Sequence, residues 1–223
     1  MSLLEQMDRR TFLGTAAVAA SSVAGNAAPP SGKVTASVML WTLKGTFEQK
    51  VEIAAKAGCQ SVELVGEHLE WSDTKIAEMK KLVRSLGLGM DTISAMANWP
   101  KEKVSMVDPA QRENMLKSVA LNIEFAKKLE IPQLLLMSGN EIPGRTFDEQ
   151  YASMLEGCKR AGDLAAKAGV TMIIEPLNNK VNHKGFFMSN CVDALRMLKE
   201  VDNPHVRLLF DIYHEQVQLG DVT

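Results

Sequence analysis

Apolar and polar positions follow a repeating two-part pattern from Val34 onward. Short apolar runs, as expected of strands buried on both faces, alternate with longer stretches in which apolar residues recur every three or four positions. The short runs predict strands over 34–40, 61–65, 88–94, 133–137, 170–174 and 206–210. The longer stretches predict helices over 46–57, 73–85, 109–129, 147–168 and 191–201. This alternation predicts parallel strands joined by crossover helices.

Two folds accommodate such an alternation, an open doubly wound sheet and a closed (β/α)8 barrel. The open sheet predicts a glycine-rich phosphate loop, but neither G-x-G-x-x-G nor G-x-x-x-x-G-K-[ST] occurs in the sequence. Polar residues instead follow successive strands, as in a barrel whose site occupies its C-terminal face. They include Glu63 with His68, Ser138 with Asn140, Glu175 with Asn178, and Asp211 with His214. The sequence therefore predicts an α/β protein of the (β/α)8 TIM-barrel type.

The predicted barrel is incomplete. A TIM barrel needs eight βα units and about 250 residues, whereas six strands are predicted here. We therefore expect about six βα units, with the chain truncated after the sixth strand. The alternative is an open sheet with exposed edges, which would favour oligomerisation or aggregation.

Residues 1–32 have the features of a targeting segment, and the barrel domain is expected to span 33–223. Arg9 and Arg10 precede a weakly apolar, alanine-rich run, which is the twin-arginine export pattern. The run is too short to cross a bilayer, so no membrane span is expected once the signal is removed. The sequence thus predicts a periplasmic protein. The alternative is a cytoplasmic protein with a disordered tail.

Composition and charge restrict the partners. The chain has 223 residues, of which 46% are apolar, and a formal net charge of −2. This composition suits one sizeable core and gives no reason to expect a nucleic acid or an anionic membrane as partner. The three cysteines form no C-x-x-C pair, so free thiols are expected at Cys59, Cys158 and Cys191.

The strongest chemical signal is a pair of acids at two neighbouring strand tips. Glu175 ends the fifth predicted strand and Asp211 ends the sixth. Because adjacent parallel strands lie about 4.8 Å apart, the two carboxylates could share one divalent cation. Oxygen ligands suit Mg²⁺ or Mn²⁺, and an added imidazole would admit Zn²⁺, Co²⁺ or Fe²⁺. The alternative is structural: Glu175 would cap the following turn, and Asp211 the following helix.

Several polar residues near these acids are candidates for substrate binding. His214 lies three residues beyond Asp211, where a neutral imidazole could bind a metal or donate to a substrate oxygen, or could simply be a structural residue. Asn178 follows Glu175, and His183 lies in the segment 178–189, which has no helical pattern and is a lid candidate. His68, beyond the second strand, is a weaker candidate, as is His183.

Two stretches resemble the hydroxypyruvate isomerase family, which belongs to the xylose-isomerase-like TIM barrels. They are Glu175-Pro-Leu-Asn-Asn-Lys-Val and Phe210-Asp-Ile-Tyr-His214. The resemblance implies that Glu175 exchanges the substrate proton and also binds the metal. It further implies that Asp211 is a second metal ligand and that His214 contacts substrate oxygens. In that family the third ligand and a second catalytic glutamate come from the last two strands, for which this sequence has no counterpart.

The activity implied is a metal-dependent aldose–ketose isomerisation through an enediolate, such as hydroxypyruvate to tartronate semialdehyde. The partner would be a small carbohydrate or hydroxy acid, and a homo-oligomer is compatible with the sequence. Related 3-epimerases carry an acid where this chain has Val181, which argues against an epimerase. Four histidines and a net negative charge argue against a three-metal endonuclease. A degenerate, non-catalytic sugar-binding barrel remains the main alternative.

Overall fold

The computed structural model describes residues 34–96 and 103–220. The chain divides into two units, 1–34 and 35–223, and the fold is that of the second. The predicted targeting segment, 1–32, lies outside the described residues. Among the described helices, none combines the length and the apolar character needed to cross a membrane.

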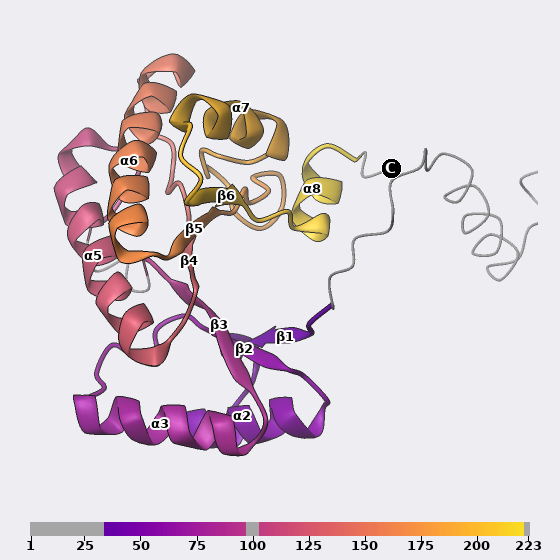
Figure 1. Cartoon of the computed structure of the whole chain (residues 1–223). Helices are drawn as coiled ribbons and strands as arrows, with labels where there is room; N and C mark the ends of the chain where they lie inside the picture. Colours follow the sequence, from indigo (N-terminus) through magenta and orange to yellow (C-terminus); the bar gives the residue numbers. More distant parts are fainter. Residues whose placement is uncertain (1–33, 97–102, 221–223) are drawn as a thin grey trace, which may run out of the picture. The chain divides into compact units, whose positions relative to one another are not determined.

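Six parallel strands form one sheet in sequence order (Figure 1). They are β1 (Ser37–Met39), β2 (Ser61–Leu64), β3 (Gly89–Ser94), β4 (Gln133–Leu136), β5 (Thr171–Ile174) and β6 (Val206–Leu208). The crossover helices are α2 (Phe47–Lys56), α3 (Asp73–Ser85), α5 (Arg112–Leu129), α6 (Phe147–Ala168) and α7 (Cys191–Val201), and α8 (Ile212–Gln218) follows β6. This is the predicted (β/α) arrangement, with six strands present.

The boundaries differ from the predicted ones mainly at the strands, which are one to four residues shorter. The apolar runs continue past the paired segments because the apolar pattern does not mark where the hydrogen-bond ladder ends; Leu88 and Val170 are buried outside their strands, whereas Val34 and Phe210 are exposed. Two short 3₁₀ helices, η2 (Leu40–Thr42) and η3 (Pro109–Gln111), replace the end of the first predicted strand and the start of the third predicted helix.

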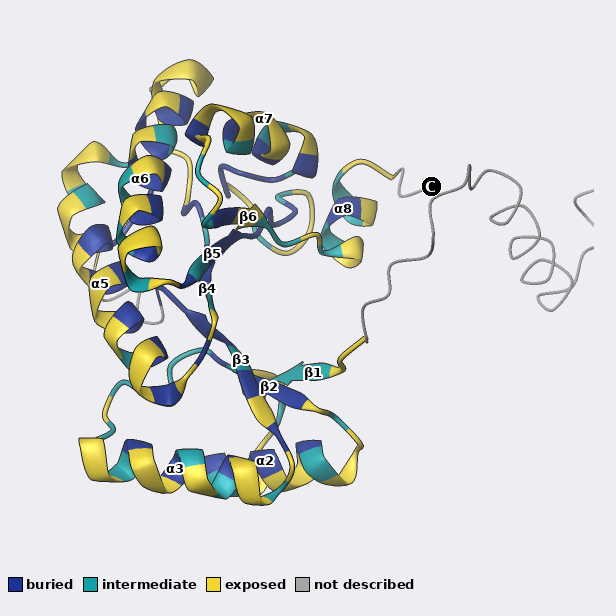
Figure 2. Cartoon of the chain, viewed as in Figure 1, coloured by how far each residue is buried: buried dark blue, intermediate teal, exposed yellow. Residues whose placement is uncertain are grey.

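One face of the sheet is covered by helices. Val206 of β6 lies against Gly162 of α6, and its register partner Met172 of β5 is fully buried on the same face. Because side chains alternate along a strand, Ile173 and the residue after β5, Glu175, lie on the opposite, inner face. Figure 2 shows this buried layer between strands and helices.

The inner face is more polar than the prediction of strands buried on both sides implies. Glu63 of β2 is half-buried, and Arg207 of β6 is exposed. Asp91 of β3 accepts a hydrogen bond from Ser37 Oγ at 3.2 Å. The sheet therefore presents ionisable side chains on the side away from its helices, and this is the side from which Glu175 projects.

Candidate functional site

Glu175 is delivered by the end of β5. Its backbone N–H donates to Leu136 O of β4 at 3.2 Å, which continues the β4–β5 ladder by one residue. Its side chain is 8% exposed. Within residues 34–96 and 103–220 no hydrogen bond reaches its carboxylate, so the alternative of a turn-capping glutamate has no support there.

Asp211 begins α8 as its N-cap. Its Oδ1 accepts the backbone N–H of His214 at 2.9 Å, which satisfies one of the free N–H groups of the first helical turn. Asp211 therefore caps the following helix, which the sequence analysis gave as the alternative to metal binding. This role does not exclude metal binding, because capping uses Oδ1 and leaves Oδ2 available.

His214 projects from the first turn of α8, and its Nδ1 receives two donors from Asn178. The backbone N–H of Asn178 lies 3.2 Å from Nδ1, and the side-chain Nδ2 lies 2.6 Å from it. A backbone N–H can only donate, so Nδ1 must accept. The neutral ring then carries its proton on Nε2, which becomes a hydrogen-bond donor. His214 is thus arranged to donate to a ligand rather than to coordinate a cation.

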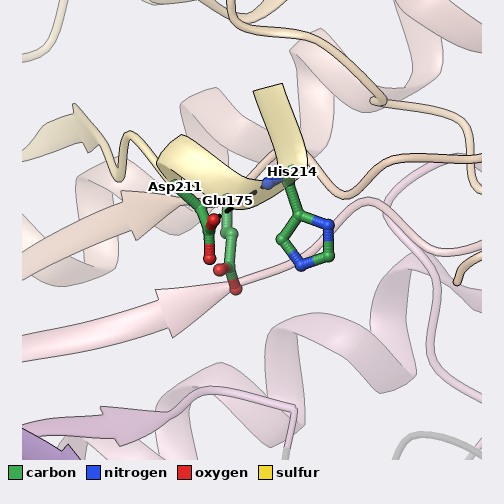
Figure 3. Close-up of side chains that lie close together, drawn as sticks. All are labelled: Glu175, Asp211 and His214. Atoms are coloured by element: carbon green, nitrogen blue, oxygen red, sulfur yellow. Dashed lines mark hydrogen bonds between the residues drawn. The ribbon is translucent and has the colours of Figure 1, made fainter. Parts of the chain in front are cut away.

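The three side chains converge, as Figure 3 shows. One ligand atom from each of Glu175, Asp211 and His214 lies within 4.8 Å of the other two. The pairing of β5 with β6 produces this cluster, because both strands end at the same edge of the sheet. The sequence-based expectation that the two acids meet at neighbouring strand tips agrees with the structure.

The electrostatics of the cluster favour a carboxyl group that titrates near neutral pH. Burial raises the pKa of Glu175 to about 7, and the nearby carboxylates of Asp211 and Glu63 contribute to the rise. Burial lowers the pKa of His214, although Asp211 opposes that shift. A neutral imidazole therefore stands beside a carboxyl group that can gain or lose a proton at physiological pH.

The other predicted substrate-binding residues are placed differently. Asn178 is fully buried beside His214, and the ring of His183 lies 5.3 Å from that of His214. His68 is not part of this cluster. It is fully buried, with Nε2 2.7 Å from Asn122 Oδ1 of α5 and its ring at an angle to that of Phe125. His68 therefore packs against α5, away from the cluster, whereas the equally buried Asn178 contacts His214.

Sequence reasoning did not count Glu63 among the site residues, although it noted the residue at a strand tip. Its carboxylate contributes to the rise in the pKa of Glu175, and its side chain projects from the same inner face of the sheet. The signal that could have identified Glu63 is the alternation of side chains along a strand. Val62 and Leu64 are buried against helices, so Glu63 must face the other way. What the sequence could not show is the curvature that brings β2 toward β5.

The donor set suits a hard divalent cation. Both oxygens of Glu175 and Oδ2 of Asp211 are free of hydrogen bonds from described residues, and carboxylate oxygens are the ligands such ions prefer. The proton on His214 Nε2 makes a third protein ligand from this residue unfavourable. Glu175 and Asp211, the two ligands that the sequence analysis expected, are within reach of one another, and their binding of a metal stays a prediction.

Residues 51–222 match the family model described as "Xylose isomerase-like TIM barrel". The chain is 25% identical to the hydroxypyruvate isomerase of Escherichia coli K12 over 79% of this chain and 67% of that protein. It is also 25% identical to a 2-oxo-tetronate isomerase of Pectobacterium atrosepticum, over 79% of this chain and 66% of that one. The chain thus spans about two thirds of the length of these relatives.

Solved structures agree on the fold. An AP endonuclease, family 2, from Brucella melitensis superposes with a TM-score of 0.70 at 23% identity, covering 85% of this chain and 73% of that one. D-psicose 3-epimerase from Clostridium cellulolyticum H10 gives a TM-score of 0.72 at 17% identity, covering 85% and 67%. The resemblance noted in the sequence is confirmed: this chain belongs to the xylose isomerase-like TIM barrel family.

Proposed function

We propose that this chain carries the Glu175–Asp211–His214 part of an isomerase site for a small hydroxycarbonyl acid or sugar, with hydroxypyruvate as the first substrate to test. The observation that carries the proposal is the convergence of these three side chains within 4.8 Å at one edge of the sheet. The names of the E. coli and Pectobacterium relatives, both isomerases, support the same reaction class.

Glu175 is the residue proposed to move the proton. Isomerisation requires removal of a proton from the carbon beside the carbonyl and its return to the neighbouring carbon. In the metal-free chain the pKa of Glu175 is raised to about 7, near the operating pH at which a general base works best. A cation bound at this site would lower that pKa and favour the deprotonated form, which can accept the proton. Its carboxylate has no competing hydrogen bond among the described residues.

His214 is proposed to orient the substrate. Its Nε2–H would donate to a substrate oxygen, while Asn178 fixes the tautomer by donating to Nδ1. The depressed pKa of His214 keeps the ring neutral, so that it polarises an oxygen without a competing proton transfer.

Glu175 and Asp211 would together hold a divalent cation, for which Mg²⁺ or Mn²⁺ is the first choice because all the protein ligands are oxygens. When bound, such an ion supplies Lewis-acid polarisation of the carbonyl and hydroxyl oxygens of the substrate. Asp211 has one oxygen for this purpose, since the other caps α8.

A sugar epimerase and a non-catalytic sugar-binding barrel are the competing proposals. D-psicose 3-epimerase shares the fold, but at 17% identity the likeness extends no further than the fold. Val181 is 61% exposed and uncharged at the position where the related epimerases carry an acid, which favours the isomerase.

The test is proton exchange between hydroxypyruvate and deuterated water, followed by NMR in the presence of Mn²⁺ or Mg²⁺. In the Glu175→Gln variant we expect exchange and isomerisation to fall by about 10²- to 10⁴-fold, the usual contribution of a general base. Glu156→Gln, which changes an exposed glutamate on α6, is the matched control and should leave the rate unchanged. Equal rates in the Glu175→Gln variant and the unmodified chain would exclude the proposed role. Saturable sugar binding without exchange would favour the non-catalytic barrel.

A further inference from the structure

Two of the three cluster residues depend on a very short helix. Asp211 caps α8 and His214 lies in its first turn, yet α8 has only seven residues. A helix of this length is not stable in water by itself, because nucleation costs more than so few hydrogen bonds return. The pairing of β5 with β6 brings Asp211 toward Glu175, and contacts that α8 makes with the rest of the chain must then hold the helix that carries Asp211 and His214.

Those contacts come largely from the segment that follows Glu175. Gln218, in the last turn of α8, makes three hydrogen bonds to it. Gln218 Oε1 accepts the backbone N–H of Asn179 at 3.1 Å, and Gln218 Nε2 donates to Asn179 Oδ1 at 3.1 Å and to Ser189 Oγ at 3.2 Å. Both hydrogen-bonding ends of the glutamine side chain are thus used.

A second contact holds the middle of the helix. Glu215 is 5% exposed, and its Oε2 accepts the backbone N–H of Cys191, the first residue of α7, at 2.9 Å. A carboxylate at a helix N-terminus is favourable because free N–H groups and the helix dipole both attract negative charge. Glu215 thus joins α8 to α7, while Gln218 joins it to the segment after β5.

The segment that receives Gln218 is itself anchored to the neighbouring strand tip. Phe187 N–H donates to Gly139 O at 3.1 Å, and Met188 N–H donates to Ser138 Oγ at 3.1 Å. Glu141 N–H donates to Gly185 O at 2.7 Å. Residues 186–189 are therefore buried and joined to the end of β4, whereas residues 180–182, 184 and 185 are exposed.

We infer that Gln218 is a positioning residue: by binding Asn179 and Ser189 it sets the place of α8, and hence the distance of Asp211 and His214 from Glu175. The expected effect on cation binding rests on the proposed function, whereas the effect of Gln218 on the placement of α8 can be measured separately. Gln218 touches neither the substrate nor the cation; it acts through α8.

The test measures Mn²⁺ affinity by electron paramagnetic resonance on the full chain, with amide hydrogen exchange on the metal-free protein. Gln218→Ala should weaken Mn²⁺ binding about five- to thirtyfold, because its three side-chain hydrogen bonds no longer hold α8. It should also speed exchange at the His214 amide, which donates to Asp211. Gln218→Glu keeps the acceptor for Asn179 N–H and should recover part of both effects.

Gln216→Ala is the matched control. Gln216 lies on the same helix and is exposed, and its side chain makes no hydrogen bond to another described residue. It should leave both measurements unchanged. Asp211→Asn identifies the part of Mn²⁺ binding that belongs to the cluster.

Each outcome decides either the positioning role of Gln218 or the proposed cation site. If Gln218→Ala lowers thermal stability but binds Mn²⁺ as tightly as the unmodified chain, Gln218 is merely structural and the inference is overturned. Equal losses of Mn²⁺ affinity in the Gln216→Ala and Gln218→Ala variants would overturn the inference as well. If the unmodified chain binds no Mn²⁺, the proposed cation site is wrong. The positioning role is then decided by His214 amide exchange alone: faster exchange in Gln218→Ala supports it, and unchanged exchange rejects it.

Discussion

At the residue scale, the features that suit Glu175 for proton transfer also lower the stability of the folded protein. Glu175 is almost fully buried, lacks hydrogen bonds from described residues and lies near two other carboxylates. Each of these features disfavours the charged form, so ionisation costs folding free energy unless a cation is present. A residue that is unfavourable for the fold but well placed for proton transfer is the pattern expected of a functional site.

Glu175→Gln should therefore stabilise the metal-free protein at alkaline pH. The pKa of Glu175 rises from 4.5 to about 7 on folding, so the folded state binds the proton more tightly and stability falls as pH rises between these values. Between these pH values, ionisation of Glu175 should lower the free energy of unfolding of the unmodified chain by up to about 3 kcal/mol. The glutamine variant has no carboxyl group at this position and should not show this decrease.

Urea denaturation with a chelator at pH 5 and pH 8 measures this difference. The Glu175→Gln variant should exceed the unmodified chain in stability most at pH 8. Glu156→Gln, which changes an exposed residue, should behave like the unmodified chain. A variant less stable than the unmodified chain at pH 8 would show that contacts in the folded protein stabilise the charged form of Glu175.

At the scale of elements, helices were predicted more accurately than strands. The predicted limits of α3, α6 and α7 coincide with those in the structure. Their ends carry local signals, such as the capping box of Thr146 and Glu149 at the start of α6 and the left-handed Gly169 at its end, with φ of 73°. Strand ends are less predictable because they depend on the neighbouring strand, which is distant in sequence.

Two glycines within α6 have different reasons to be there. A Cβ on Gly162 would lie 2.7 Å from Val206 Cγ2 and 3.0 Å from Asn203 Nδ2, so it would push α6 away from β6. A Cβ on Gly157 would lie 3.3 Å from the terminal Cε atoms of Met106 and Met115, which are flexible. Only Gly162 is required by close packing.

Gly162→Ala should therefore destabilise the protein by about 1–3 kcal/mol through overpacking. Gly157→Ala should stay within about 1 kcal/mol of the unmodified chain, because the gain in helix propensity offsets a small shift of the methionines. Thermal unfolding of both variants gives the comparison. Equal destabilisation by the two would mean that Gly157 is packed as closely against Met106 and Met115 as Gly162 is against Val206.

At the scale of the whole molecule, the sheet has two edges among the described residues, β1 and β6. Unpaired strands present free N–H and C=O groups that favour pairing with another chain. Beyond β6, several large apolar side chains are exposed; they are Phe210, Ile212, Tyr213 and Leu219. The oligomerisation foreseen from the sequence therefore remains a prediction, with a specific surface on which to test it.

Sedimentation velocity over a range of concentrations should reveal reversible association of the chain. Phe210→Lys, which places a charge just beyond β6, should weaken it several-fold or more. Leu121→Lys is the matched control, because Leu121 has nearly the same exposure, 51% against 50%, but lies on α5. A monomer at every concentration, or an equal effect of both changes, would contradict an interface at this edge.

The sequence by itself determined the elements, their order, the parallel sheet and the two acids at neighbouring strand tips. These follow from local periodicity and from the rule that parallel strands end at one edge, which requires no knowledge of distant contacts. The export of the protein and its place in the cell remain predictions from residues 1–32.

Tertiary structure alone decided which polar residues share the site and what state they are in. His68 and His214 both follow a predicted strand, yet packing buries one against α5 and places the other beside Glu175. The tautomer of His214, the raised pKa of Glu175 and the role of Gln218 all depend on partners far along the chain or on burial. Local patterns cannot encode such contacts, because they arise only when the sheet curves and brings its strand tips together.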